Sequence, residues 1–420
     1  MFTLIEALRF RSLRYVHRSL APFHVLVGPN ASGKTTFLDV VGFMSDFVRE
    51  GLDAAIQERT QNLQDLFWKR GGDSFELAVE VRFPEARRDR LPDPDFSLIR
   101  YELVVGIDPE TKENCVVAER GLLKKAPRPE PATPRSLFPH AAKEPDTLLT
   151  PDKATGKRVV LSKKPGKNVN YSSETYGESG KGWVTPFKLG PQRSALASLP
   201  DDERKFPVAT WFKEFLGTGI QRLTLNSLLI RRASPPGQVR GFKPDGSNLP
   251  WVVHDLKQHH PNRARDWLEH VRTALPEIES IDTQERADDR HRYLTVTYQG
   301  GITVPSWVVS DGTLRLLALT LIAYLSAPAS AYLIEEPENG IHPRAVETLL
   351  QSLSCVYDSQ VLVATHSPII LSSVEASNVL CFAKGSDGAT DIVRGDQHPN
   401  LRTWRGEENL GVLFAGGVLG

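Results

Sequence analysis

Hydrophobic positions near the start of the chain follow one pattern and then another. Residues 23–27 (FHVLV) form a short apolar run that stops at Gly28, which predicts a buried strand of a parallel sheet. Beyond the glycine-rich stretch, apolar side chains recur at helical spacing from Phe37 to Val48, and the pattern ends near Gly51. The first unit is therefore predicted to be strand, loop and helix.

The next segment alternates instead. Apolar and polar residues alternate strictly over 75–83, which predicts a half-exposed antiparallel strand. Residues 98–107 and 115–117 are expected to form its hairpin neighbours. Residues 126–181 are rich in Pro, Gly, Ser and Lys and weakly periodic. We expect them to form a long, partly flexible surface insertion.

The second half returns to longer elements. Helical patterns run over 208–275, and a hairpin is expected from 293–298 and 302–309. Residues 316–334 carry no charge and are long enough to resemble a membrane span. Pro328 nevertheless separates a helical half from a strand-like half, so we expect a buried helix, a buried strand and no membrane contact.

Composition adds few constraints. Lys plus Arg and Asp plus Glu both number 51, so a nucleic-acid surface would have to be a local patch. The three cysteines show no metal-binding spacing, and the N-terminal residues do not resemble a signal peptide. We therefore expect a reducing, cytoplasmic compartment.

The most specific signal is GPNASGKT over 28–35, which fits the phosphate-binding loop pattern. Such a loop turns successive N–H groups and a helix N-terminus toward phosphate oxygens. Lys34 would reach the β- and γ-phosphates, and the Thr35 hydroxyl would hold Mg²⁺. The residues expected to bind nucleotide here are Gly28, Pro29, Asn30, Ala31, Ser32, Gly33, Lys34, Thr35 and Thr36.

An acid pair follows the buried strand predicted at 331–334. Strand ends of a parallel sheet meet at one edge, so Glu335 and Glu336 are expected beside the loop. Glu335 would hold Mg²⁺ through water, and Glu336 would orient or deprotonate the attacking water. The alternative is a solvated acidic turn.

Two further positions have both a structural and a chemical reading. His366 ends the next buried strand and could point at the γ-phosphate, although a lone histidine is usually structural. Ser310 precedes the apolar helix as a predicted N-cap, and the amides after it could bind an anion. A simple cap remains the alternative there.

In this order the motifs GPNASGKT, SDGT, IEEPENGIHP and THSP resemble the ABC ATPases, specifically the stand-alone branch related to RecF, SMC and OLD proteins. The segment 245–249 (DGSNL) is similar to one common in that branch. The resemblance implies an α/β P-loop NTPase fold of the ABC type, with a mixed sheet, an antiparallel β subdomain and a helical insertion. The chain departs from the pattern of the transporter ATPases at two places, with SDGT in place of LSGGQ and Glu335 in place of the usual Asp. Both departures are normal for the branch, and each leaves the hydrolysis rate open.

The resemblance also implies a mechanism. Two chains would sandwich ATP and Mg²⁺, with Ser310 and Gly312 touching the γ-phosphate held by the partner's loop. Residues 339–342 would lie at the dimer seam. Gln192 is the candidate for the Mg²⁺-sensing glutamine, against the alternative of an exposed loop residue.

We expect five segments along the chain. They are an N-terminal ATPase lobe (1–125), a flexible basic insertion (126–188), a Q-loop and helical subdomain (189–290), a C-terminal ATPase lobe (291–385) and a tail (386–420).

The expected function is an ATPase without an effector of its own. Heptad arms are missing and only about 50 residues follow His366, so we expect neither a long coiled coil nor an OLD-type nuclease domain. The leading hypothesis is the ATPase subunit of a bacterial antiphage system, Septu-like or PARIS-like, with a separately encoded nuclease or toxin; the alternative is a RecF-like DNA repair ATPase. Two surfaces stay open: the basic segment 152–167, as a nucleic-acid contact or a solvated loop, and the apolar tail 404–420, as core or docking surface.

Overall fold

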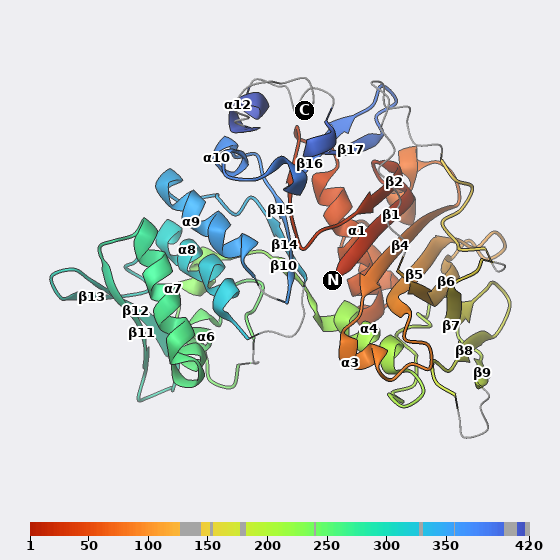
Figure 1. Cartoon of the computed structure of the whole chain (residues 1–420), viewed down its shortest axis with the longest axis horizontal. Helices are drawn as coiled ribbons and strands as arrows, with labels where there is room; N and C mark the ends of the chain where they lie inside the picture. The colour runs from red at the N-terminus through yellow and green to blue at the C-terminus, as the bar shows by residue number, and fades with distance from the viewer. Residues whose placement is uncertain are drawn as a thin grey trace.

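The computed structural model describes residues 1–126, 144–151, 154–176, 182–238, 241–326, 331–356, 358–398 and 410–415. These residues fold around three sheets, with the largest on one side of the molecule and most helices on the other (Figure 1). Within this described part, no helix has the length and apolar character needed to cross a bilayer.

The largest sheet is antiparallel throughout and has eight strands in the order β2-β1-β4-β5-β6-β7-β8-β9. Their bounds are β1 Phe2–Phe10, β2 Leu13–Ser19, β4 Ser74–Arg82, β5 Phe96–Ile107, β6 Asn114–Lys125, β7 Lys157–Lys163, β8 Val169–Ser172 and β9 Val184–Phe187. The expected hairpins are present. Three strands that the sequence did not predict (β7, β8 and β9) lie in the segment expected to be an irregular insertion.

The second sheet carries the predicted phosphate-binding loop. It has six strands in the order β10-β14-β15-β3-β16-β17, parallel except for the last. Their bounds are β10 Ile220–Leu223, β14 Ala331–Glu335, β15 Gln360–Ala364, β3 Phe23–Val27, β16 Val379–Lys384 and β17 Thr390–Arg394. The carboxyl ends of β3, β14 and β15 therefore meet at one edge.

A smaller antiparallel sheet lies at the far end of the helical side (Figure 1). It consists of β11 Ile278–Glu285, β12 Arg292–Tyr298 and β13 Ile302–Pro305, which includes the predicted hairpin. The helices are α1 Lys34–Glu50, α2 Leu52–Gln57, α3 Glu85–Arg88, α4 Pro207–Thr218, α5 Ser227–Ile230, α6 Leu249–His259, α7 Pro261–Ala274, α8 Asp311–Leu321, α9 Pro343–Ser354, α10 Pro368–Ser372 and α12 Leu410–Ala415.

The parallel sheet is buried on both faces. Leu26, Leu333 and Leu362 join a core with α1, α4 and the antiparallel sheet. Val25 and Val363 face the opposite core, which α6, α7, α8 and α9 build. Strands covered on both sides need apolar residues at consecutive positions, and this explains the short continuous apolar runs in the sequence.

The alternation over 75–83 led to one wrong prediction. Strand β4 is not half-exposed, because the side chain of Glu80 on its polar face is only 5% exposed. Residues 144–151 lie over that face, and the carbonyl of Leu148 accepts a hydrogen bond from Arg100 of β5 at 3.0 Å. A covering segment without periodicity of its own could not be read from the alternation of the strand.

The tail prediction can be followed only in part. Leu410, in α12, is buried in the core of the helical side. Residues 404–409 and 416–420 lie outside the described residues.

Candidate nucleotide site

The loop between β3 and α1 has the geometry of a phosphate cradle. Gly28 has φ +152°, and a Cβ atom there would lie 2.2 Å from the carbonyl oxygen of Phe382 in β16. Only glycine fits so close to a neighbouring strand. Ala31 also takes a left-handed conformation, with φ 60°. The loop is thereby bent back over the start of α1, whose first residue is Lys34.

The Lys34 side chain lies over this loop. Its Nζ donates hydrogen bonds to the carbonyl oxygens of Gly28 at 2.7 Å and Pro29 at 3.0 Å. Burial lowers the pKa of Lys34 to about 8, while the nearby carboxylates of Glu336 and Glu335 act in the opposite direction. The lysine is a partly desolvated cation whose charge an incoming phosphate would stabilise.

Glu335 connects three elements at the carboxyl edge of the sheet. Its Oε2 accepts a hydrogen bond from the hydroxyl of Thr35 at 2.6 Å. Its Oε1 forms an ion pair with Nη2 of Arg222, from β10, at 2.8 Å. The first contact was expected from the motifs, whereas Arg222 was not.

Glu336 departs from ordinary backbone geometry. Its φ is 48°, in the left-handed region, and its N–H donates to the carbonyl of Ala364 in β15 at 2.7 Å. Its carboxylate also accepts a hydrogen bond from the side chain of Asn339. A non-glycine residue in this conformation costs on the order of 1 kcal/mol, and such strain concentrates at functional sites.

His366 faces the same cleft from the end of β15. Burial lowers the pKa of the imidazole, and the charge of Lys34 lowers it further. The ring is therefore neutral near pH 7, and one nitrogen can donate while the other accepts. Thr365, just before it, donates to a carboxylate oxygen of Glu338 at 2.5 Å and ties the two strand ends together.

The cleft has a volume of about 470 Å³. It brings together most of the predicted site residues. Its lining consists of Arg11, Ser12, Asn30, Ala31, Ser32, Gly33, Lys34, Thr35, Thr36, Glu335, Glu336, Ala364, His366 and Lys384. Sequence reasoning missed Arg11 and Ser12, in the turn between β1 and β2, and Lys384, at the end of β16, because a single basic or hydroxyl residue carries no local signal.

Gln192 is not among the residues that line this cleft. Its neighbour Pro191 accepts hydrogen bonds from the backbone of Val116 at 2.9 Å and from Lys163 at 3.0 Å. Those residues belong to β6 and β7, which β4 and β5 separate from β1. The sequence placed a glutamine beside Glu335, but the structure places Arg222 there.

The SDGT segment begins α8 as predicted. The hydroxyl of Ser310 accepts a hydrogen bond from the backbone N–H of Thr313 at 3.2 Å, which confirms the N-cap. Asp311 pairs with Arg231 at 2.7 Å. A Cβ atom on Gly312 would lie 2.3 Å from the carbonyl oxygen of Gly340, so the first turn of α8 touches the loop that contains Gly340. Ser310 and Gly312 do not line the cleft of their own chain.

The basic segment 152–167 is mostly engaged within the fold. Lys163 is 5% exposed and donates to the carbonyl of Arg193 at 2.6 Å. Arg158 donates to the carbonyl of Ser173 at 2.6 Å, and Lys157 donates to that of Pro151. Residues 152–153 lie outside the described part of the chain. Because it is buried, Lys163 cannot contact a nucleic-acid phosphate, which was one of the two alternatives that the sequence left open for this segment.

The donor set fits a nucleotide with a divalent cation. Thr35 and Glu335 present two oxygen atoms 2.6 Å apart at the cleft wall, and oxygen is the ligand that Mg²⁺ prefers. The loop also holds the hydroxyl of Ser32, which is buried and has no hydrogen-bond partner among the described residues. An unsatisfied donor next to a lysine and a helix N-terminus suits a phosphate oxygen.

This fold and cleft define a P-loop ATPase of the ABC type, in the group that contains the SMC and OLD proteins. Residues 23–91 and 193–372, more than half of the chain, match the family described as "AAA domain, putative AbiEii toxin, Type IV TA system". The chain belongs to this family, and it is an ATPase.

Individual proteins are similar to this chain over different lengths, and the solved structures among them bear on the fold alone. An 89-residue stretch is 33% identical to the Old nuclease of Escherichia phage P2; it covers 18% of this chain and only 15% of that nuclease. Among solved structures, an SMC head bound to the C-terminal winged-helix domain of ScpA is similar, with a TM-score of 0.52 and 12% identity, over 93% of this chain and 96% of that one. An SMC head with an extended coiled coil, bound to a ScpA domain from Pyrococcus furiosus, gives a TM-score of 0.47 at 13% identity over 93% and 95% of the two chains.

Proposed function

We propose that this ATPase works as a nucleotide-sandwich dimer in which each site is completed by the other chain. The observation that carries the proposal is the separation of the two anion-binding loops. The cleft holds the phosphate-binding loop and the acid pair, while Ser310 and Gly312, at the exposed start of α8, lie outside it. A second copy facing the cleft would supply them.

Within one half-site the side chains divide the work of hydrolysis. Lys34 and the loop N–H groups bind the phosphates, with Thr35 and Glu335 holding Mg²⁺. When bound, Mg²⁺ neutralises charge that develops between the β- and γ-phosphates. Glu336 orients or deprotonates the attacking water, and the side chain of Asn339 donates a hydrogen bond to its carboxylate. His366 donates a hydrogen bond to the γ-phosphate.

The test is a mixing experiment with two inactive variants. Lys34→Ala removes the phosphate-binding cation, and Ser310→Arg blocks the loop offered to the partner. Each alone should have no ATPase activity, while a mixture should recover part of it, because a mixed dimer contains one intact site. The proposal fails if mixed dimers are shown to form and no mixing ratio restores activity.

We further propose that ATP-driven closure is read by a separately encoded nuclease or toxin in a bacterial defence system. The family description, with its toxin–antitoxin system, supports this direction. So does the SMC head, which was solved with a bound partner domain. The measurement is co-purification with the neighbouring gene product, with and without ATP and in the Glu336→Gln background. A RecF-like role in DNA repair replaces this proposal if nothing co-purifies and DNA ends stimulate the ATPase.

A further inference from the structure

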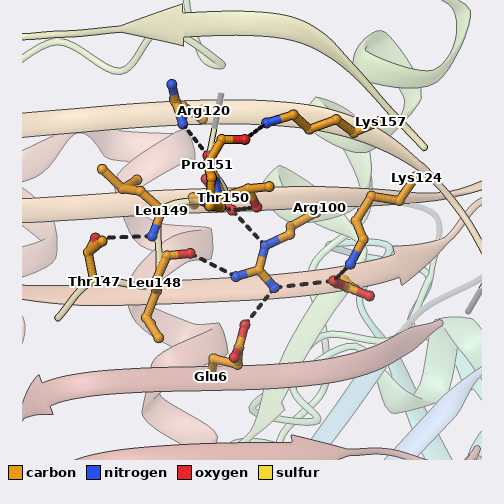
Figure 2. Close-up of polar contacts among 12 residues, drawn as sticks. Glu6, Arg100, Arg120, Lys124, Thr147, Leu148, Leu149, Thr150, Pro151 and Lys157 are labelled. Atoms are coloured by element: carbon orange, nitrogen blue, oxygen red, sulfur yellow. Dashed lines mark hydrogen bonds and ion pairs between the residues drawn. The ribbon is translucent and has the colours of Figure 1, made fainter. Parts of the chain in front are cut away.

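Residues 144–151 lie across the outer, charged face of the antiparallel sheet, opposite the face that packs against α1 and α4. Figure 2 shows Thr147 to Pro151 running over strands that carry Glu6, Arg100 and Arg120. We call residues 144–151 the strap. Its ends adjoin residues outside the described part of the chain.

The sheet holds the strap mainly by its backbone. The N–H groups of Leu148 and Thr150 donate to the carboxylates of Glu76 at 2.6 Å and Glu102 at 2.9 Å. In the other direction, the carbonyls of Leu148 and Thr150 accept from Arg100 at 3.0 Å and from Arg120 at 2.7 Å. Lys157 donates to the carbonyl of Pro151 (Figure 2). The carboxylates accept hydrogen bonds from backbone N–H groups, and the cations donate to backbone carbonyls. Such contacts recognise an extended backbone and do not depend on the identity of its side chains.

Four strap side chains add selectivity. Leu148 is 6% exposed and packs against Leu8, Ala78 and Tyr15. The hydroxyls of Thr147 and Thr150 donate to Glu76 and Glu102. At the other end, Glu144 pairs with Arg9 at 2.8 Å and lies 4.0 Å from Arg14. The pattern is an acid, then a hydroxyl residue and leucine at the third and fourth positions after it, then a second hydroxyl residue.

The surface beneath the strap can be hydrated. Arg100 lies among Glu6, Glu80 and Glu102 at 2.5, 3.2 and 2.6 Å, and Lys124 also bonds Glu80. Burying such a cluster carries a desolvation cost, so water could replace the strap without exposing a large apolar surface. The strap is therefore not needed to seal the hydrophobic core, which lies on the other face of the sheet.

The same surface is connected to the nucleotide cleft. Arg9 and Arg14, which hold the acidic end of the strap, belong to β1 and β2. The turn between these strands contributes Arg11 and Ser12 to the cleft. A shift of this turn when nucleotide binds would move the anchor of Glu144.

We propose that this face of the sheet is a docking site for an extended peptide segment of a partner protein, and that residues 144–151 occupy it as an internal stand-in. The proposal rests on the effector binding proposed above and names the chemistry of the segment that docks. The partner segment carries an acid, a hydroxyl residue followed by leucine, and a second hydroxyl residue, with the spacing of Glu144, Thr147, Leu148 and Thr150.

The probe is a fluorescent synthetic peptide with the sequence of residues 144–151. The host is the full chain with these residues replaced by a Gly/Ser linker of equal length. Fluorescence anisotropy should show this host binding the peptide at least tenfold more tightly than the wild-type chain, whose site is filled. A control peptide that carries Leu148→Asp should bind this host with an affinity at least tenfold lower than the wild-type peptide. Equal binding by both hosts, or equal binding of both peptides, overturns the proposal.

A second host guards against misfolding of the replaced chain. The point variant Leu148→Asp leaves every strand unchanged and loosens only the strap, so it should also capture the wild-type peptide more tightly than the wild-type chain does. ATP binding by both hosts reports that they are folded. Failure of capture by two hosts that bind ATP sinks the docking site, while the mixing experiment for the sandwich dimer would be unaffected.

Discussion

The guanidinium of Arg222 lies 2.8 Å from a carboxylate oxygen of Glu335, although 113 residues separate them in sequence. Parallel pairing of β10 with β14 brings them to the same sheet edge. Thr35 binds the other oxygen of that carboxylate. The acid proposed to hold Mg²⁺ is therefore already shared between a hydroxyl and a cation.

Replacing Arg222 should change the metal requirement. Arg222→Ala frees one oxygen of Glu335, so the Mg²⁺ concentration for half-maximal ATPase activity should fall. A half-exposed ion pair such as that between Arg222 and Glu335 contributes about 0.2–1 kcal/mol, so the Mg²⁺ concentration for half-maximal activity should fall by roughly 1.5- to 5-fold. Arg222→Lys, which keeps the charge, serves as the control. A higher Mg²⁺ requirement in the alanine variant would show that Arg222 supports the metal site and does not compete with it.

Glu336→Gln should separate binding from hydrolysis. The amide keeps the shape of the side chain but cannot accept a proton, so single-turnover hydrolysis should slow by about 10²–10⁴-fold. Affinity for ATP should change little. Glu347→Gln, on the exposed face of α9, is the matched control and should hydrolyse ATP like the wild type. Wild-type turnover in the Glu336 variant would remove this residue from the mechanism.

Binding of ATP should weaken at alkaline pH. Burial lowers the pKa of Lys34 to about 8. Raising the pH from 7 to 9 therefore deprotonates the Lys34 side chain of the nucleotide-free protein and removes its positive charge. Affinity should fall about tenfold over that range, with proton uptake on binding at pH 8 to 9. Calorimetry in two buffers of different ionisation enthalpy measures both quantities. In Lys34→Arg the affinity should not vary with pH, and a flat wild-type profile would contradict the assignment.

Gly312→Ala should damage the loop contact beside the SDGT segment. The added Cβ atom would lie 2.3 Å from the carbonyl of Gly340, so either the first turn of α8 or the loop that contains Gly340 must move, at a cost of about 1–3 kcal/mol. The ATPase rate should fall even where the fold persists. Gly217→Ala is the control: its Cβ meets nothing within 4 Å inside α4, and it should stabilise the chain by about 0.5–1 kcal/mol. Equal effects of the two changes would argue against the contact.

Glu174 should make stability depend on pH. Its carboxylate accepts the first N–H groups of α4, from Val208 at 2.6 Å and Ala209 at 2.8 Å, while burial raises its pKa to about 7. The folded chain therefore holds this proton more tightly than the unfolded chain. Stability contributed by Glu174 is fully present below pH 4.5 and is lost as the pH rises from there through about 7.

Urea unfolding from pH 4 to 8 measures the effect. The free energy of unfolding of the wild type, relative to Glu174→Gln, should fall by on the order of 1–3 kcal/mol across that range. Glu214→Gln, on the exposed face of the same helix, should show no such slope. A rise in the relative stability with pH would contradict the raised pKa.

Local sequence predicted the parts of the site whose chemistry is local. The phosphate-binding loop, the acid pair after β14 and the cap at Ser310 each lie within a few residues and follow from backbone and capping rules. Arg222 and Arg11 could not be found in this way. Their role depends on which strands pair, and a single arginine in a short strand or in a turn carries no pattern.

The insertion shows the same limit in the fold. Val159, Val160 and Leu161 of β7 form a short apolar run flanked by Gly- and Lys-rich residues, so the run was too short to outweigh the composition. The covered face of β4 was missed because the strap binds it mainly through backbone groups, which leave no mark on the sequence, and the few side chains that add to them show no periodicity. Gln192 was misplaced because the antiparallel sheet is wider than the strands first recognised in it.

The position of β3 between β15 and β16 has a consequence for how the chain is made. The strand that precedes the phosphate-binding loop leaves the ribosome early, yet both of its neighbours lie beyond residue 359. Its hydrogen-bonding edges stay unpaired until most of the chain has been synthesised. The antiparallel sheet, whose strands follow one another closely from β4 to β9, can assemble first and shelter one side of this strand. A truncated product ending before β15 should therefore fold its antiparallel half, bind no ATP and be prone to aggregation.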